Sequence, residues 1–314
     1  MRFELLFLGT AASAPSAERG LPALLVTFGR HRVLVDCGEG TQRQILKSGA
    51  GLKGLNRILL THAHLDHVLG LGGLIATLAL FDIRGTVTIN GGPATLAYAE
   101  RLLTGGVWGG GLLPVPVAFA PVAPGVLVED GRFRISAFPV IHGEAESFGF
   151  LFEAVPMRHL DAARLESLSV PKGPPRSRLA AGLPVRLDDG RVITPEDVAG
   201  PSDPGLRLAV IGDVGETETL VEVVRGADAL VIEATFLEAD RDKAERWGHL
   251  TARQAAALAA EAEVEQLFLT HLSPRYETAQ ILAEARAVFP RTRVAADFDH
   301  VTIARARRPE LASR

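Results

Sequence analysis

The chain has 314 residues, of which 47% are hydrophobic, and a formal net charge of −4 at pH 7. This length gives a prior of about two domains, and the apolar content is sufficient for a large core. The nearly neutral charge excludes a globally basic surface, so any nucleic-acid binding must come from a local patch. Cys37 is the only cysteine, which excludes an intrachain disulfide and suits a reducing cytosol.

The N-terminal region predicts short strands joined by loops of small residues. Strands are expected at Phe3–Leu8 and, as a hairpin, at Leu24–Phe28 and Val33–Val35. A helix should then begin near Thr41, because Thr41 and Gln44 have the spacing of a capping box.

No apolar run in this sequence predicts insertion into a membrane. The run Leu5–Leu8 is too short for the apolar part of a secretory signal peptide. The longest run, near Leu69–Phe81, contains Gly72 and Gly73 and is better explained as a core helix. We therefore expect a soluble, cytoplasmic protein without a membrane partner.

A cluster of histidines follows the next predicted strand. Residues 62–67 read His-x-His-x-Asp-His, between an apolar strand at Asn56–Leu60 and an apolar helix at Val68–Phe81. The first two histidines can converge on one point from a loop at the strand end, whereas Asp66 and His67 are sequence neighbours and would serve a second point. Imidazole and carboxylate are the ligands of zinc and similar divalent ions. A single histidine would be explained as an ordinary surface or core residue, but this spacing predicts two metal ions close together.

Strands and helices alternate through the rest of the chain, except in one segment. Residues 155–205 contain eight of the nineteen prolines and little apolar periodicity, so we expect a functional or mobile loop there. Four further candidate residues, His142, Asp213, His249 and His271, lie at strand ends or loop starts. The expected elements are strands at Thr86–Ile89, Val115–Phe119, Phe133–Phe138, Phe148–Glu153, Leu206–Ile211, Ala229–Glu233 and Gln266–Thr270, and helices at Pro93–Leu103, Thr251–Ala262 (with a capping box at Thr251 and Gln254) and Gln280–Phe289.

The order of these candidate residues resembles the metallo-β-lactamase superfamily: His-x-His-x-Asp-His, and then single His, Asp and His residues. The resemblance implies an α/β fold of four layers, αββα, with two sheets face to face and helices outside, and the observed alternation agrees with it. One such domain would span residues 1–314, with residues 155–205 inserted as a projecting arm. Leu65 stands where many members have glycine, at a position that carries no ligand.

By the same resemblance, the chain would hold two zinc ions. The ligands would be His62, His64 and His142 for one ion, and Asp66, His67 and His271 for the other. Asp213 would bridge the two ions, since a carboxylate has two oxygens. Two ions about 4 Å apart can share a hydroxide nucleophile and stabilise both the attacking and the leaving oxygen of phosphoryl transfer.

Four further stretches resemble the ribonuclease Z family, the endonucleases that process the 3′ ends of transfer RNA. They are Asp36–Gln42, Ile232–Phe236, Gly248–Thr251 and Leu269–Tyr276. In the family, the glutamate and histidine that match Glu233 and His249 pair to protonate the leaving oxygen, and Asp66 would orient or deprotonate the attacking water as well as bind zinc. The chain departs from the family at Val214, Ile232 and Leu250, where threonine, histidine and serine are usual.

Residues 155–205 resemble the projecting arm of this family. A local basic excess alone would indicate a solvated loop, but in the family context it predicts contact with RNA. The arm residues expected to contact RNA are Lys172, Gly173, Pro174, Arg176 and Arg178. The family forms homodimers in which the arm of one subunit holds RNA that the other cuts, so a homodimer is implied.

The two tryptophans belong to no motif. We expect Trp108 and Trp247 to pack within the fold. The position of Trp247, close before His249, leaves a role in base stacking open.

The resemblance as a whole implies a zinc-dependent endoribonuclease. It would cut precursor transfer RNA on the 3′ side of the acceptor stem, remove the 3′ trailer and leave a 3′-hydroxyl on the transfer RNA. A dinuclear-zinc phosphodiesterase of small molecules on the same fold would share every ligand but would not need the arm. A metal-binding or RNA-binding relic without activity is disfavoured, because no matched ligand position is lost.

Overall fold

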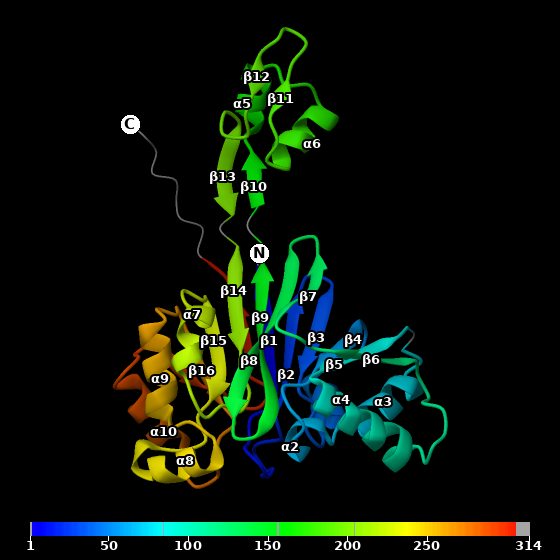
Figure 1. The fold of residues 1–314 in the computed structure, drawn as a ribbon, viewed down its shortest axis with the longest axis vertical. Helices are drawn as coiled ribbons and strands as arrows, with labels where there is room; N and C mark the ends of the chain where they lie inside the picture. Colours follow the sequence, from blue (N-terminus) through cyan, green and yellow to red (C-terminus); the bar gives the residue numbers. More distant parts are fainter. Residues whose placement is uncertain (1, 84, 156, 204, 306–314) are drawn as a thin grey trace.

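Two mixed sheets form the centre of the molecule (Figure 1). The computed structural model describes residues 2–83, 85–155, 157–203 and 205–305, and within these residues each of the two sheets has seven strands. The first sheet has the order β18 (His300–Ile303), β1 (Phe3–Gly9), β2 (Ala23–Phe28), β3 (His31–Val35), β4 (Leu55–Leu59), β5 (Val87–Gly91) and β6 (Val117–Pro121). The second has the order β17 (Thr292–Val294), β16 (Leu267–Thr270), β15 (Ala229–Glu233), β14 (Leu206–Val210), β9 (Ala145–Ala154), β8 (Phe133–His142) and β7 (Gly125–Asp130).

Helices lie outside both sheets. Beside the first sheet are α1 (Thr41–Ser48), α2 (Leu65–Val68), α3 (Leu71–Leu80), α4 (Pro93–Glu100) and the π-helix η1 (Arg101–Val107). Beside the second are α7 (Val221–Val224), α8 (Arg241–Trp247), α9 (Ala252–Glu261), α10 (Thr278–Arg286) and the short 3-10 turns η2 (Glu218–Leu220) and η3 (Glu238–Asp240). The four-layer αββα prediction is therefore confirmed. No helix among the described residues is both long enough and apolar enough to cross a membrane.

The alternation of side chains along the strands explains the layers. In β1, Phe3, Leu5 and Phe7 belong to the core between the sheets, together with Phe150 of β9. Leu8 belongs instead to the core between the first sheet and its helices. Successive side chains of a strand point to opposite faces, so a strand that is apolar on both faces needs a layer on each side.

The junction between α2 and α3 corrects one prediction. The prediction of a single helix over Val68–Phe81 is wrong, because the helix is interrupted at Leu69 and Gly70. There the Gly70 N–H donates to the Cys37 carbonyl at 2.9 Å, and the Cys37 N–H donates to the His67 carbonyl at 2.8 Å. The two backbones lie so close that a Cβ atom at Gly70 would be 2.0 Å from the Gly38 oxygen.

The two predicted capping boxes have different outcomes. At α9, Thr251 and Gln254 form the box, as predicted. At α1, Thr41 is the first helical residue and its hydroxyl donates to the Gly38 carbonyl at 2.7 Å, so the predicted box with Gln44 is wrong. The Thr41 hydroxyl therefore closes the glycine-rich turn before the helix.

A turn follows β17, which ends at Val294. In this turn, Phe298 has a φ of 70° and the Asp297 carboxylate accepts hydrogen bonds from Thr10 and Gly20. The chain then enters β18, which pairs antiparallel with β1. The sequence patterns predicted neither β18 nor β7. β18 is an edge strand of the first sheet, and β7 is an edge strand of the second.

The arm between β9 and β14 is more regular than predicted. It contains β10 (Met157–Leu160), α5 (Ala162–Ser167), α6 (Pro174–Ala180), β11 (Val185–Arg186), β12 (Val192–Ile193) and β13 (Ala199–Asp203). Leu165, Val170, Leu179 and Ile193 form part of a small core of its own. The arm projects from the second sheet in continuation of β9 and β14 (Figure 1). Its apolar residues occur singly among prolines, so they produced no periodic signal.

Candidate active site

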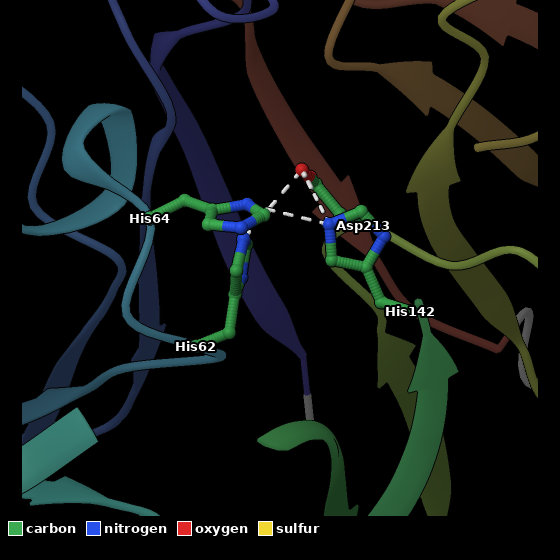
Figure 2. A group of neighbouring side chains, drawn as sticks. All are labelled: His62, His64, His142 and Asp213. Carbon is green, nitrogen blue, oxygen red and sulfur yellow. Dashed lines mark hydrogen bonds and ion pairs between the residues drawn. The ribbon is translucent and has the colours of Figure 1, made fainter. Parts of the chain in front are cut away.

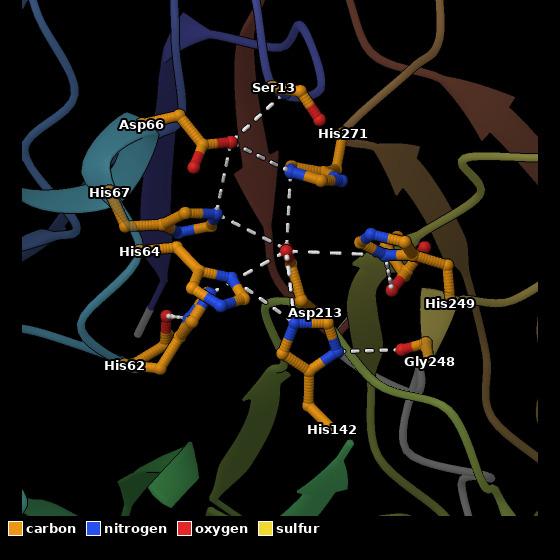
Figure 3. Close-up of polar contacts among 12 residues, drawn as sticks. Ser13, His62, His64, Asp66, His67, His142, Asp213, Gly248, His249 and His271 are labelled. Carbon is orange, nitrogen blue, oxygen red and sulfur yellow. Dashed lines mark hydrogen bonds and ion pairs between the residues drawn. The ribbon is translucent and has the colours of Figure 1, made fainter. Parts of the chain in front are cut away.

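The candidate metal ligands come from strand ends and from one short helix. His62 and His64 lie just after β4, and Asp213 lies just after β14. His142 is the last residue of β8, and His271 directly follows β16. Side chains at the carboxyl ends of parallel strands reach the same edge of a sheet. Asp66 and His67 lie on α2. The structure brings all seven candidates together (Figure 3).

The first group consists of His62, His64, His142 and Asp213, whose ligand atoms lie within 4.8 Å of one another (Figure 2). His142 Nε2 is 3.3 Å from His64 Nδ1. Asp213 Oδ2 is 3.6 Å from His62 Nε2 and 3.7 Å from His142 Nε2. Three imidazole nitrogens and one carboxylate oxygen therefore surround one point.

The second group consists of Asp66, His67 and His271. Asp66 Oδ2 is 3.6 Å from His67 Nε2 and 3.4 Å from His271 Nε2. Asp213 faces this group through its other oxygen, because Oδ1 is 3.3 Å from His67 Nε2 and 3.2 Å from His271 Nε2. Each oxygen of Asp213 thus faces one group, which is the arrangement that a bridging carboxylate needs.

Three buried polar atoms show that these residues fit metal ions. His62 Nε2, His67 Nε2 and Asp213 Oδ1 are buried and have no hydrogen-bond partner among the described residues. Buried polar atoms normally have a partner, since leaving one unpaired costs about 1–3 kcal/mol. Imidazole nitrogen and carboxylate oxygen are donors that zinc and similar divalent ions prefer.

Each buried histidine of the two groups is held through its other ring nitrogen. His62 Nδ1 is 3.0 Å from the Thr61 hydroxyl, and His271 Nδ1 is 2.9 Å from the Thr235 hydroxyl. His67 Nδ1 is 2.8 Å from Asp36 Oδ2, and His142 Nδ1 is 2.6 Å from the Gly248 carbonyl. Such contacts fix the ring orientation and leave Nε2 free to bind a metal.

Sequence reasoning missed these supporting residues. Asp36 opens the glycine-rich motif, and its carboxylate also accepts hydrogen bonds from the Thr61 N–H and hydroxyl. Asp36 and His271 both have positive φ values, of 59° and 53°. Such backbone conformations are costly for residues other than glycine and are held by surrounding contacts at functional sites. The motif that contains Asp36 marks this residue as functional, but only the folded chain shows that its carboxylate orients His67.

Burial and the local charges shift the pKa values of the site's side chains. Burial lowers the pKa of His62 well below its usual value. Burial acts in the same direction on His67, but the Asp213 and Asp36 carboxylates outweigh it and raise the pKa of that imidazole well above its usual value. For Asp66, burial opposes ionisation, but the hydrogen bond from His271 and the His67 charge hold the pKa of the carboxyl below its usual range.

Glu233 and His249 form a separate pair beside Asp213. His249 Nδ1 is 2.8 Å from Glu233 Oε1 and 4.0 Å from Asp213 Oδ2. Burial lowers the pKa of His249, but the Glu233 charge and hydrogen bond outweigh it and raise the pKa to about 9. The imidazole is therefore protonated at neutral pH, as a general acid must be. Its Nδ1 is committed to Glu233, which leaves Nε2 to donate a proton.

Three neighbours besides His249 hold Glu233 in place. Its side chain is 0% exposed. Oε1 accepts from the Val214 N–H at 2.8 Å, and Oε2 accepts from the Leu250 N–H at 3.2 Å and from the Thr235 hydroxyl at 2.6 Å. Glu233 thus positions His249 and does not itself reach solvent.

Comparisons with known proteins agree with this geometry. The metallo-beta-lactamase superfamily matches residues 22–147, and a beta-lactamase superfamily domain matches residues 180–272. Ribonuclease Z of Bradyrhizobium diazoefficiens is 56% identical over 96% of this chain and 100% of its own length. The chain belongs to the ribonuclease Z family. It is therefore a metal-dependent hydrolase of the metallo-β-lactamase fold.

Two solved structures show the same fold. The short form of human tRNase Z matches with a TM-score of 0.67 and 24% identity, over 96% of this chain and 99% of that one. The metallo-beta-lactamase fold protein YhfI from Bacillus subtilis matches with a TM-score of 0.69 and 18% identity, over 96% and 100%. At these identities, the two matches speak for the fold alone.

The three departures from the ribonuclease Z pattern share one environment. Val214, Ile232 and Leu250 are all 0% exposed and belong to the core between the second sheet and its helices. Two of them hold Glu233 through backbone N–H groups, which do not depend on the side chain. Val214 and Leu250 therefore keep their backbone contacts with Glu233, although their side chains differ from the family pattern.

The arm of this ribonuclease Z relative presents its basic residues unequally. Lys172 and Arg178 are exposed. Arg176 donates from Nε and Nη2 to the Val170 carbonyl at 3.1 and 2.9 Å, so its guanidinium supports the arm backbone. Gly173 and Pro174 begin α6, where Gly173 has a φ of 96° that favours glycine.

Proposed function

We propose that this protein is a zinc-dependent endoribonuclease that cuts precursor transfer RNA on the 3′ side of the acceptor stem. The trailer is removed and the transfer RNA keeps a 3′-hydroxyl. The observation that carries the proposal is the combination of two metal-ligand groups with a separate acid pair, in a chain that is 56% identical to a curated ribonuclease Z.

Two Zn²⁺ ions are the proposed cofactors. The groups described above would hold them, with Asp213 between. When bound, the ions would polarise the phosphoryl oxygens and lower the pKa of the attacking water. The described nitrogen and oxygen donors, including the unpartnered atoms of His62, His67 and Asp213, support this assignment.

The protein's own groups would move two protons. Asp66 Oδ2 accepts a hydrogen bond from the Ser13 N–H at 3.0 Å and stands at the edge of the second group, where it would orient or deprotonate the attacking water. His249 would protonate the leaving 3′ oxygen, and Glu233 would hold the imidazole in the donor tautomer. The side chain of His249 is 12% exposed, so it is open to a substrate from one side.

The arm supports an RNA substrate over the rival, a dinuclear-zinc phosphodiesterase of small molecules. A small substrate would need only the metal groups and the acid pair, whereas this chain carries a folded extension with exposed cations at Lys172 and Arg178. Phosphate contacts by such cations position nucleic acids. We further propose that the protein acts as a cytoplasmic homodimer in which one arm holds RNA for the partner's site.

Mapping the 3′ ends of a precursor transfer RNA after incubation with purified protein tests the proposal. We expect one cut on the 3′ side of the acceptor stem, a free 3′-hydroxyl and loss of activity with a chelator. Cleavage of an aryl phosphodiester together with an intact precursor would favour the small-molecule rival. Sedimentation measurements would show whether the active species is a dimer.

A further inference from the structure

Trp247 is exposed two residues before His249 of the acid pair, contrary to the packing role predicted for it. It is 64% exposed, at the end of α8. The next two residues are Gly248, whose carbonyl accepts from His142 Nδ1, and His249, which binds Glu233 (Figure 3). Consecutive Cα atoms are about 3.8 Å apart, so the indole is attached within roughly 8 Å of the backbone that carries the acid.

Arg246 adds a positive charge to this indole. Its guanidinium carbon lies 5.6 Å from the centroid of the Trp247 ring, within the range of a cation–π contact. The other cations of α8 are neutralised, because Arg241 pairs with Glu238 and Glu245 and Lys243 pairs with Asp240. Among the described residues, Arg246 makes no ion pair, so its charge remains available to a phosphate-bearing ligand.

The Trp247 side chain is largely exposed even though the Arg246 guanidinium lies over its ring. The ring therefore has an open face. An exposed indole with a neighbouring guanidinium is the kind of platform on which unpaired nucleotide bases stack. Among the described residues, the other tryptophan, Trp108, offers no comparable exposed ring, because it packs partly buried against the core of the first sheet.

The chemistry of the proposed reaction says which base would reach this platform. Water adds its oxygen to the phosphorus, the bond from phosphorus to the 3′ oxygen breaks, and His249 gives a proton to that oxygen. The leaving oxygen belongs to the last nucleotide that the transfer RNA keeps. We therefore expect the residues next to His249 to lie nearer to this nucleotide than to the trailer.

We propose that Trp247, backed by Arg246, stacks on the unpaired base of the nucleotide that carries the leaving 3′ oxygen. This inference rests on the proposed function and adds a subsite to it. Stacking there positions the ribose so that its 3′ oxygen meets His249. Trp247 is thus a substrate-binding residue that orients the leaving group.

A coupling experiment between protein and RNA tests this subsite. Wild type and Trp247→Ala are compared on intact precursor and on precursor with an abasic residue at the nucleotide that carries the leaving oxygen. We expect Trp247→Ala to lower kcat/KM on the intact precursor by about five- to a hundred-fold. On the abasic precursor, the two proteins should cleave at similar rates, because the stacking partner is already gone. Trp247→Phe should recover part of the loss, and Arg246→Ala should lose less than Trp247→Ala.

Two controls separate stacking from other roles. An abasic residue just after the cut should slow wild type and Trp247→Ala by the same factor. Val126→Ala removes an equally exposed apolar side chain, 57% exposed, and should cleave like wild type. Val126 pairs with Ser136, six residues before His142 on β8, which places it roughly 20 Å away along the strand.

The outcomes are distinguishable. Equal losses from Trp247→Ala on intact and abasic precursors would overturn the subsite, because a merely structural role slows both. A change in sedimentation with Trp247→Ala would also overturn it and place the indole in an interface between subunits. If wild type does not cleave the intact precursor at the acceptor stem, the proposed function fails, whatever the variants do.

Discussion

In the candidate active site, the imidazoles of the two metal-ligand groups are buried and held by a neighbour, apart from the exposed His64, whereas in the arm the cations stand in solvent on a small core. His62 and His67 are almost fully buried, and Thr61 and Asp36 fix their rings. Lys172 and Arg178 are exposed and make no such contact among the described residues. The site thus holds its side chains in a fixed geometry, which catalysis needs. The exposed cations of the arm can instead change conformation to meet the phosphates of a flexible ligand.

This contrast predicts that a substitution in the site abolishes activity, whereas a substitution in the arm weakens RNA binding by degrees. The first test is Asp213→Ala, with the largest expected effect. Because the two oxygens of Asp213 face the two groups, the variant should lose metal from both and all measurable activity. His142→Ala should lose less metal, since His142 belongs to one group.

Elemental analysis of the purified variants measures this effect. Wild type should contain two ions per chain, and both variants should remain folded by circular dichroism. One ion in wild type, with all seven ligands intact, would contradict a bridging role for Asp213.

The second test removes the acid and leaves the metal groups. His249→Ala should lower turnover of precursor transfer RNA by about 10²–10⁴-fold, the usual contribution of general acid catalysis. Metal content should stay nearly unchanged, because Nδ1 of His249 is bound to Glu233 and not directed at an ion. On an aryl phosphodiester, whose leaving group hardly needs a proton, the loss should be much smaller.

The control for His249→Ala is the ratio of the two losses. Equal losses on RNA and on the aryl diester would remove the acid role. Loss of metal along with activity would instead make His249 a ligand, in line with its position near Asp213 and His271.

Local sequence indicated four of the seven candidate ligands because their spacing is short. His62, His64, Asp66 and His67 lie on one strand end and the following helix, so the motif alone indicates two directions. Apart from Thr61 beside His62, the supporting contacts were not predictable, since their partners are distant in sequence. His142 is held by Gly248, 106 residues away, and His271 by Thr235, 36 residues away.

The fold shows the same limit. The layers followed from apolar strands such as β15, whose side chains are buried on both faces. The edge strands β7 and β18 are short and partly exposed, so they have a weak pattern and depend on partners elsewhere in the chain. Trp247 was assigned to packing from its residue type, although only the tertiary structure determines its exposure.

The third test breaks the arm without touching its charges. Leu179 is fully buried in the arm core, and Leu179→Ala should destabilise that core by about 2–5 kcal/mol. Amide hydrogen exchange should then accelerate in residues 160–199 and not in β14 or β15. Binding of precursor transfer RNA should weaken, while metal content and hydrolysis of an aryl diester stay close to wild type.

Leu183→Ala is the matched control, because Leu183 lies in the arm but is 49% exposed. Its effect on stability should stay within about 0.5 kcal/mol. If Leu179→Ala loosened β14 and the metal groups as well, the arm and the site would form one cooperative unit, and the contrast between them would fail.

The smallest expected effect concerns the exposed cations. Lys172→Ala combined with Arg178→Ala should weaken RNA binding and flatten its salt dependence, because each lost phosphate contact lowers the log–log slope by roughly 0.7–0.9. The double variant should therefore change the slope by about one to two units, and hydrolysis of an aryl diester should barely change. Arg176 is kept, since its guanidinium supports the Val170 carbonyl and its loss would mix stability with charge.

Arg191→Ala serves as the control for net charge in that last test. Its guanidinium is already paired with Asp189 at 2.6 Å, so it should affect the salt slope less than Lys172 and Arg178 do. A salt titration of RNA affinity for the three proteins measures the difference. An unchanged slope in the double variant would remove these cations from recognition. A loss of aryl diester hydrolysis would place them in the catalytic pocket, and the arm would no longer be a separate region of function.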